Sequence, residues 1–292
     1  MQHPVLCYGS MRSAGIAAVA ALAAAAAAQQ AQNPSPMVEH TREHGRLGGE
    51  PPAGRRESLD PGTLFLPATI KLRNGVPVLF FFHGGDRVPE IAAARNDMAL
   101  VAVQIGAGSG TYARAFQNPG RFPALLAAAE GKTGVTFGRV VLGGWSAGCG
   151  AIREILKAPE AYRRTAAVLL IDGMHAGYST GKPGPLESDL ETAPLDIWLT
   201  LARDAVRGLK RMVVTHSEIF PGTFASTTET ADWLLRQLNL KRGPVLKWGP
   251  MGTQQIGEAR AGRFLLIEYA GNSAPDHVDQ LHSLPAYLKW LK

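Results

Sequence analysis

The stretch that decides the fold is RVVLGGWSAGCGAIREIL, residues 139–156. It begins with an apolar run typical of a buried strand, passes through Gly144-x-Ser146-x-Gly148, and continues with apolar residues at helical spacing. This order predicts a strand, a tight turn and a helix, with the serine raised above the end of the sheet. The two glycines remove side chains that would clash where strand and helix nearly touch. The first N–H groups of the helix suit an oxyanion that develops beside the serine oxygen.

The composition is that of one large α/β domain. The chain has 292 residues, of which 46% are hydrophobic and 18% are charged, enough to bury a sizeable core. The net charge of +6 admits an anionic partner, but the basic residues are scattered and are not interleaved with aromatic residues along one stripe. The sequence therefore gives no indication of nucleic-acid binding.

The N-terminal segment has the features of a targeting signal. Arg12 precedes an alanine-rich apolar run, and Ala26 and Ala28 stand before Gln29 in the manner of a signal-peptidase site. The run is too short and too rich in alanine to be a comfortable membrane span. We expect residues 1–28 to be a cleaved signal peptide, and the mature protein to be secreted or periplasmic without stable membrane insertion. An uncleaved helical anchor is the alternative.

The cysteines and histidines do not indicate a disulfide framework or a metal site. Cys7 lies inside the segment expected to be removed, which would leave Cys149 as a lone thiol. Cys149 is expected to be a small buried residue on the first turn of the helix rather than a nucleophile. No cluster of cysteine, histidine and carboxylate residues has metal-ligand spacing. The sequence predicts no cofactor.

From residue 61 onward, strand-type and helical segments alternate. Residues 29–60 are polar and rich in proline and glycine, and are expected to be a flexible leader. Apolar runs then predict strands at 63–65, 69–72, 78–82, 99–105, 140–142, 166–171, 212–215 and 264–267. Uninterrupted apolar strands separated by helices imply a mostly parallel sheet with helices on both faces. We assign 61–292 to this α/β domain, with a short lid expected around 178–211.

The carboxyl end of the strand at 78–82 carries a glycine-rich string, His83-Gly84-Gly85-Asp86. Ligands bind at the carboxyl ends of the strands in such sheets, and glycines let the backbone approach a ligand with free N–H groups. We expect the N–H of Gly85 to be an oxyanion donor beside the N–H of Ala147. Gly84 and Asp86 are the alternatives for Gly85.

Two further strand ends and a late loop carry the remaining catalytic candidates. Asp172 directly follows the apolar run 166–171, and Glu218 follows the strand at 212–215. His277 lies in the loop or first helical turn after the last predicted strand, from where its ring can reach back to Ser146. These residue types match a nucleophile, a base and an orienting acid. The spacing alone does not decide whether Asp172 or Glu218 is the orienting acid.

The series of strand-HGG, strand-GxSxG-helix and late strand-loop-His, in the order serine, acid, histidine, resembles the α/β-hydrolase superfamily, and within it secreted bacterial esterase-like members. The resemblance covers about residues 62–292. It implies an approximately eight-stranded, mostly parallel sheet and a triad in which Ser146 and His277 take the family roles. The acid of the family usually follows the seventh strand, which corresponds to Glu218, whereas Asp172 follows the sixth.

The sequence thus predicts a secreted serine hydrolase that cleaves carboxylic esters through an acyl-enzyme. The substrate would be a small-molecule or polymer-attached ester, and a peptidase or amidase on the same fold is the alternative within enzymes. A binding protein that kept the fold without catalysis is the alternative from another class. Aromatic residues on the loops at the strand ends are expected to line the substrate pocket: Trp145, Tyr112, Tyr178, Phe220 and Phe224.

Overall fold

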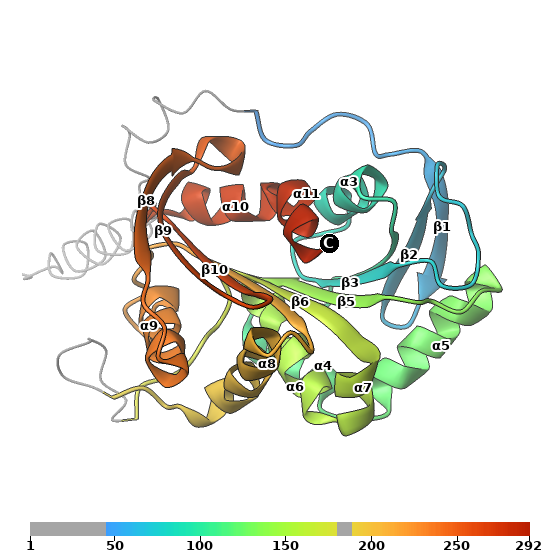
Figure 1. Ribbon diagram of the computed structural model, residues 1–292. Helices are drawn as coiled ribbons and strands as arrows, with labels where there is room; N and C mark the ends of the chain where they lie inside the picture. The colour runs from blue at the N-terminus through green and yellow to red at the C-terminus, as the bar shows by residue number, and fades with distance from the viewer. Residues whose placement is uncertain (1–44, 180–188) are drawn as a thin grey trace, which may run out of the picture.

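The protein is described by a computed structural model for residues 45–179 and 189–292, and its centre is a single sheet (Figure 1). Ten strands pair in the order β1-β2-β4-β3-β5-β6-β7-β10-β9-β8. Their bounds are β1 Gly54–Leu59, β2 Gly62–Pro67, β3 Val78–Phe82, β4 Ala99–Val103, β5 Val140–Trp145, β6 Thr165–Ile171, β7 Arg211–His216, β8 Gly243–Trp248, β9 Gln254–Ala261 and β10 Phe264–Tyr269.

The middle of the sheet is parallel and its two ends are antiparallel. Strands β4, β3, β5, β6, β7 and β10 pair in parallel, while β1, β2, β9 and β8 run antiparallel to their neighbours. This confirms the predicted fold class. The α-helices of the described residues are α3 Arg87–Arg95, α4 Ser109–Phe116, α5 Arg121–Thr133, α6 Cys149–Lys157, α7 Pro159–Arg164, α8 Asp196–Val206, α9 Thr227–Leu238, α10 Ala274–His282 and α11 Leu284–Tyr287.

Helices cover both faces of the sheet because the central strands are apolar on both faces. Along β3, Phe80 and Phe82 pack into one core with α4, α5, α6, α8 and α9, whereas Leu79 and Phe81 pack into a second core with α3 and α11. Figure 1 shows these two helix layers on opposite sides of the strands. All five residues of β3 are buried, as expected for a strand covered twice.

The strand predictions fail mainly at the edges of the sheet. Residues 69–72 form no strand, and β1, β8 and β9 were not predicted. Strand β1 has the polar sequence GRRESL and is mostly exposed, and β8 has the exposed side chains Leu246 and Trp248. Edge strands need not be continuously apolar, because only one of their faces, or neither, is covered. The sheet therefore has ten strands rather than about eight.

The leader expected for residues 29–60 is structured in its second half. Residues 54–59 form β1, and the segment before it contacts α10, where Arg46 Nε binds Asp279 Oδ1 at 2.9 Å. The backbone N–H of Leu47 donates to His282 Nδ1 at 3.0 Å. The flexible-leader interpretation is therefore wrong for this half. The predicted signal peptide 1–28 and the leader up to residue 44 lie outside the described residues.

The lid expected at 178–211 is not supported where the structure describes that segment. Residues 196–206 form α8, which buries Trp198, Leu201 and Ala202 and packs against β7, α6 and α9. Helix α8 is thus a crossover helix that belongs to the core. Residues 180–188, also within the predicted lid, lie outside the described residues.

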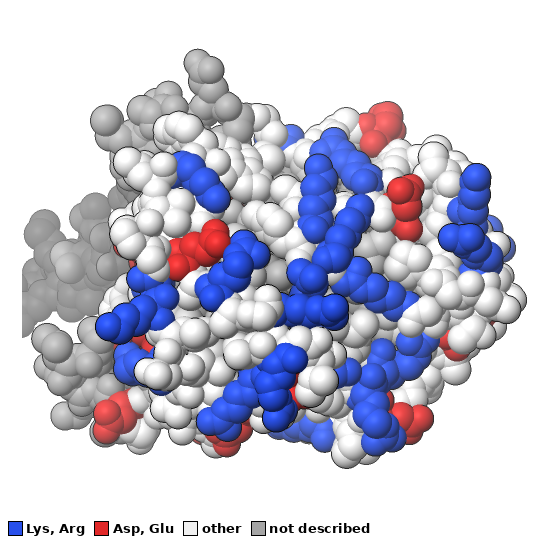
Figure 2. Space-filling view, in the orientation of Figure 1, with Lys and Arg blue, Asp and Glu red and all other residues white. Residues whose placement is uncertain are grey.

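Basic side chains are numerous on one face of the molecule, and three of them stand at the amino ends of parallel strands. Figure 2 shows Lys and Arg spread over the face on which the C-terminus lies. Arg139, Arg211 and Arg263 stand at or just before the amino ends of β5, β7 and β10. Burial, followed by repulsion from Arg211 and Arg263, lowers the pKa of Arg139. Folding therefore brings together some of the basic residues that are scattered along the sequence.

Across residues 45–179 and 189–292, no helix is long and apolar enough to span a membrane.

Candidate active site

The turn after β5 has the geometry expected of the GxSxG sequence. Ser146 begins a short 3₁₀ turn, Ser146–Gly148, that leads directly into α6. A Cβ on Gly148 would lie 1.9 Å from the carbonyl oxygen of Phe82, and one on Gly144 would lie 3.0 Å from the backbone nitrogen of Cys149. Gly148 therefore has no room for a side chain, and the packing at Gly144 is tight enough to favour glycine, as the sequence predicts. The packing of the turn against β3 is what allows the serine to stand at the end of the sheet.

Three neighbouring strands end in the same unusual backbone conformation. His83 after β3, Ser146 after β5 and Asp172 after β6 have φ angles of 71°, 49° and 45°. These left-handed values turn the chain sharply away from each strand. Strands β3, β5 and β6 are adjacent and parallel, so their turns bring the three side chains to one edge of the sheet.

His277 reaches this edge from the C-terminal part of the chain. It lies on the first turn of α10, whose start is fixed by a capping box between Ser273 and Asp276. The imidazole Nδ1 is 2.7 Å from Asp172 Oδ2. The indole Nε1 of Trp145 donates to the backbone oxygen of His277 at 3.0 Å, and the two rings lie 4.6 Å apart. The residue before Ser146 thus contacts the first turn of α10, which carries His277.

The carboxylate of Asp172 is buried, and both of its oxygens accept hydrogen bonds. Its Oδ2 accepts from Ser217 Oγ at 2.6 Å, and its Oδ1 accepts from the Ser217 N–H at 3.0 Å and from Thr227 Oγ1 at 2.7 Å. Burial alone would raise the pKa of Asp172, but the hydrogen bond and charge of His277, with the bonds from Ser217 and Thr227, hold this pKa well below its usual range. Asp172 is therefore an ionised partner for the imidazole.

Glu218 does not take part in this contact. Its side chain is exposed, and its backbone N–H donates to the oxygen of Gly271 at 2.9 Å. Its neighbour Ser217 and the first residue of α9, Thr227, bind Asp172 instead. The structure brings Asp172, and not Glu218, to His277.

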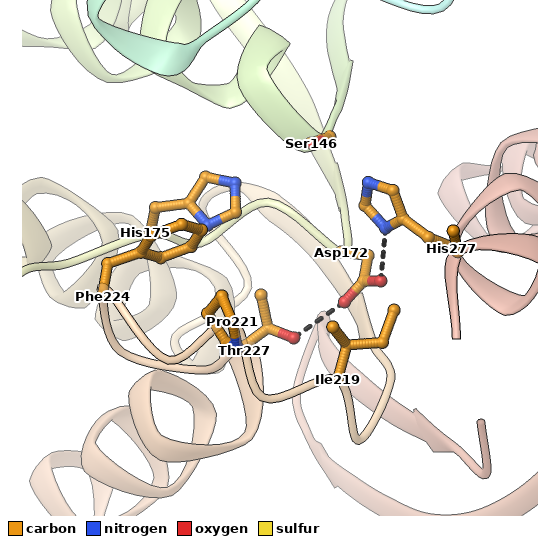
Figure 3. A pocket seen from close by; sticks show the side chains of 9 residues that line it. Ser146, Asp172, His175, Ile219, Pro221, Phe224, Thr227 and His277 are labelled. Carbon is orange, nitrogen blue, oxygen red and sulfur yellow. Dashed lines mark hydrogen bonds and ion pairs between the residues drawn. The ribbon is translucent and has the colours of Figure 1, made fainter. Parts of the chain in front are cut away.

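Ser146, Asp172 and His277 line one cavity of about 170 Å³. Figure 3 shows Ser146 at its rim, with the ring of His277 on one side and that of His175 on the other. Within the described residues, no hydrogen bond joins the Ser146 hydroxyl to His277, whose Nδ1 is bound to Asp172. A second, larger cavity of about 690 Å³ also reaches Ser146 and includes Ala147.

The glycine-rich string after β3 is arranged differently from the prediction. The N–H of Gly85 donates to Gln104 Oε1 at 3.0 Å, so the predicted oxyanion donor is already occupied. The N–H of His83 is bound to the oxygen of Val103 at 3.0 Å. The N–H of Gly84 has no hydrogen-bond partner in the described part of the chain, which favours the alternative donor.

Three of the five aromatic residues expected to line the substrate pocket have other contacts. Tyr112 is fully buried, and its hydroxyl lies 3.1 Å from His83 Nδ1. Tyr178 is buried with its hydroxyl 3.0 and 3.1 Å from the Glu229 carboxylate. Trp145 stacks on the ring of His83 at 5.1 Å. None of these three residues lines either of the cavities described above. Of the other aromatic candidates, Phe224 lines both cavities, whereas Phe220 is exposed.

Several residues of the site were missed in the sequence. His175 lines both cavities, three residues beyond Asp172, and Arg153 lines the larger one from α6. Ser217 and Thr227 hold the carboxylate, and the S-x-x-E capping signal at 226–229 was the only hint that a helix start would be placed there. Cys149 is buried, as expected, and burial raises the pKa of its thiol above the usual range. Within residues 45–179 and 189–292, no group of three His, Cys, Asp or Glu side chains could hold a metal ion.

Comparisons with known proteins add little beyond these observations. No protein-family model matches the chain, and no curated protein matches it. Among solved structures, carboxyl esterase 2 of the mycorrhizal fungus Tuber melanosporum is 15% identical with a TM-score of 0.48, over 94% of this chain and 98% of that one. A hormone-sensitive lipase from a metagenome library is 12% identical with a TM-score of 0.47, over 97% and 100%. Acetyl xylan esterase from Aspergillus awamori is 12% identical with a TM-score of 0.44, over 80% and 99%. At these values the likeness carries no argument, and the site rests on the side chains of this chain alone.

Proposed function

We propose that the protein is a serine hydrolase of the α/β-hydrolase superfamily that cleaves carboxylic esters through an acyl-enzyme. Ser146 is the nucleophile, His277 the base and Asp172 the orienting acid. The contact that supports this most is the 2.7 Å bond between His277 Nδ1 and the buried Asp172 carboxylate, in a cavity that Ser146 shares. Because Asp172 occupies Nδ1, the second ring nitrogen, Nε2, is the one available to Ser146.

In the acylation step the Ser146 oxygen attacks the ester carbonyl carbon while His277 Nε2 takes the hydroxyl proton. The bond from that carbon to the alcohol oxygen then breaks, and the alcohol leaves with the proton from His277. A water molecule attacks the acyl-enzyme by the same route, which releases the carboxylic acid and restores the serine. Ionised Asp172 holds the imidazole in the required tautomer and offsets its positive charge.

The oxyanion that forms in both steps needs two donors at the strand ends. We propose the N–H of Ala147, directly after the nucleophile, and the N–H of Gly84. This assignment departs from the sequence prediction of Gly85, whose N–H is bound to the side chain of Gln104. Both glycines have positive φ, 98° for Gly84 and 75° for Gly85, and a Cβ on Gly84 would lie 2.8 Å from Leu281, so this turn favours glycine at both positions.

A fluorophosphonate probe tests the proposal directly, because it reacts covalently with an activated serine. The wild-type protein should be labelled and should hydrolyse p-nitrophenyl acetate. Ser146→Ala should abolish both without unfolding, since it removes one hydroxyl at the end of the sheet. A folded wild-type protein that is neither labelled nor active would instead support the binding-protein alternative, and hydrolysis of amides as fast as of matched esters would support a peptidase.

We also propose that the protein is exported. The support is the sequence of residues 1–28, with a basic residue, an alanine-rich run and small residues before Gln29. Expression in a Gram-negative bacterium, followed by fractionation and N-terminal sequencing, tests this. The proposal expects a mature chain that begins near Gln29, whereas an intact Met1 or Met11 on cytoplasmic protein would contradict it.

A further inference from the structure

Two chambers of different character meet at Ser146. The small chamber, of about 170 Å³, has apolar walls from Ile219, Pro221, Phe224 and Ala274 beyond the catalytic residues. An apolar cavity of about 150 Å³ can hold one benzene ring, so this chamber accommodates a group of about six carbon atoms. The large chamber, of about 690 Å³, is lined on its polar side by His83, Ser109, Arg153, His175 and Glu191.

Arg153 brings hydrogen-bond donors into the large chamber. It lies two helical turns beyond Ser146 on α6, and only 22% of its side chain is exposed. Its Nε donates to Glu154 Oε1 at 3.1 Å, a carboxylate that Lys157 also holds at 2.7 and 2.9 Å. In the described part of the chain, the two terminal nitrogens of Arg153 have no hydrogen-bond partner. Its guanidinium therefore offers free N–H groups beside the site of attack.

Glu191 brings acceptors into the same chamber. Its backbone N–H donates to the oxygen of Gly177 at 2.9 Å, and a Cβ at Gly177 would lie 3.0 Å from Glu191 Oε2. Arg153 and Glu191 do not pair with each other within the described residues. A carboxylate on the substrate would be repelled by Glu191, and an ammonium group by Arg153. A hydroxyl group satisfies both, because it accepts from the guanidinium and donates to the carboxylate.

His175 stands where the two chambers join. Figure 3 shows its ring opposite that of His277, across the cavity from it. Its Nδ1 is buried without a hydrogen-bond partner in the described residues, and its ring contacts Phe224 edge-on at 5.2 Å. Burial lowers the pKa of His175 to about 4; the Asp172 charge opposes this shift, and His277 and Arg153 add to it. A neutral imidazole can both donate to and accept from a substrate without adding charge.

We propose that the site takes esters of a short acyl group with a hydroxyl-rich alcohol such as a sugar. The acyl chain lies in the small apolar chamber, and the alcohol lies in the large chamber between Arg153 and Glu191, with His175 at the junction. This assignment rests on the proposed esterase function and adds its substrate class. It also gives Arg153 and Glu191 a role in binding rather than in proton transfer.

The test compares glucose 6-esters with ethyl esters of acetate, butyrate and octanoate, by the acid released at constant pH. We expect the glucose ester to have the higher kcat/KM at each acyl length, and octanoate to be turned over at least tenfold more slowly than butyrate. Arg153→Met and Glu191→Gln should each lower the glucose-to-ethyl ratio of kcat/KM about tenfold, chiefly through KM, as expected for one lost charged hydrogen bond. Arg95→Met, an exposed residue on α3, is the matched control and should leave the ratio unchanged.

A wall variant tests the small chamber separately. Ile219→Ala enlarges the apolar cavity and should raise the octanoate-to-butyrate ratio. If the protein hydrolyses esters but shows equal kcat/KM for glucose and ethyl esters, or keeps the glucose-to-ethyl ratio in Arg153→Met, this inference is overturned and the esterase function stands. Octanoate esters hydrolysed as fast as butyrate esters, or an octanoate-to-butyrate ratio unchanged in Ile219→Ala, overturn the assignment of the chambers. Absence of all ester hydrolysis and of fluorophosphonate labelling overturns both proposals.

Discussion

Asparagine in place of Asp172 tests the proposed triad at the contact that defines it. The amide oxygen can replace Oδ1 and continue to accept from the Ser217 N–H and from Thr227. The amide nitrogen then stands in the place of Oδ2, 2.7 Å from His277 Nδ1. Because an amide nitrogen only donates, the imidazole must present Nδ1 as an acceptor and carry its proton on Nε2. In that tautomer Nε2 cannot take the proton of Ser146.

The expected loss for Asp172→Asn is a factor of ~10⁴ in kcat, the size found when a serine triad loses its acid but keeps its geometry. This corresponds to about 5 kcal/mol in the activation barrier. The free energy of unfolding should fall by only about 1–3 kcal/mol, since the amide has the same shape and keeps two of the four bonds. The rate and the stability are therefore expected to change by very different amounts.

The assay is kcat for p-nitrophenyl acetate, with urea unfolding followed by circular dichroism on the same samples. Ser217→Ala is the matched control, because it removes one hydrogen bond from the Asp172 carboxylate but leaves its charge and its bond to His277. This control should lose less than about tenfold in kcat. A folded Asp172→Asn protein whose kcat stays within about tenfold of the wild type would refute the assignment of the acid.

Four further outcomes follow from contacts of single residues. Glu218→Gln should keep nearly all activity in the same assay, because the carboxylate is exposed and away from His277; a loss near that of Asp172→Asn would contradict this. Cys149→Ala should also remain active, and the native thiol should resist alkylation until the protein unfolds, because burial raises its pKa. The depressed pKa of Asp172 stabilises the fold above about pH 4, the unfolded value, and this contribution is lost as the pH falls further. In urea unfolding, the difference in the free energy of unfolding between the wild type and Asp172→Asn should be smaller at pH 3 than at pH 7. Finally, the change in melting temperature from 10 to 150 mM salt should be more positive in the wild type than in Arg139→Met, because salt screens the repulsion of Arg139 by Arg211 and Arg263; equal changes would contradict that repulsion.

The sequence predicted the part of the fold where pattern and burial agree. The continuous apolar run at 78–82 is short and is followed by glycines, which favours a strand covered on both faces, and the glycines of the turn at Ser146 match the close packing found there. Strand β8 was not predicted because it is largely exposed, and β9 was not predicted because its buried residues are Gln255, Gly257 and Ala259, which give no apolar period to detect. Element type is thus predictable where the core dictates composition.

The site was predictable residue by residue only in part. Ser146, His277 and Asp172 stand at strand ends or in the loop that returns to them, and topology brings such positions together. The choice between Asp172 and Glu218 depends on hydrogen bonds from a distant helix start, which no local pattern contains. Tyr112 was expected to line the substrate pocket but is fully buried. The sequence alone does not show which side of a loop or helix an aromatic residue packs against.

The left-handed turns after β3, β5 and β6 have a consequence for how the protein inactivates. A residue other than glycine in this conformation stores strain of about 1–3 kcal/mol, and His83, Ser146 and Asp172 together would store about 3–9 kcal/mol. Domains of this kind are stable by only about 5–15 kcal/mol in total. The surrounding cores must therefore hold the three strand ends in their strained conformation. If the cores loosen, these ends release the most strain energy. Catalysis should accordingly disappear at urea concentrations where circular dichroism still reports an intact sheet, with the catalytic edge relaxing before the protein unfolds.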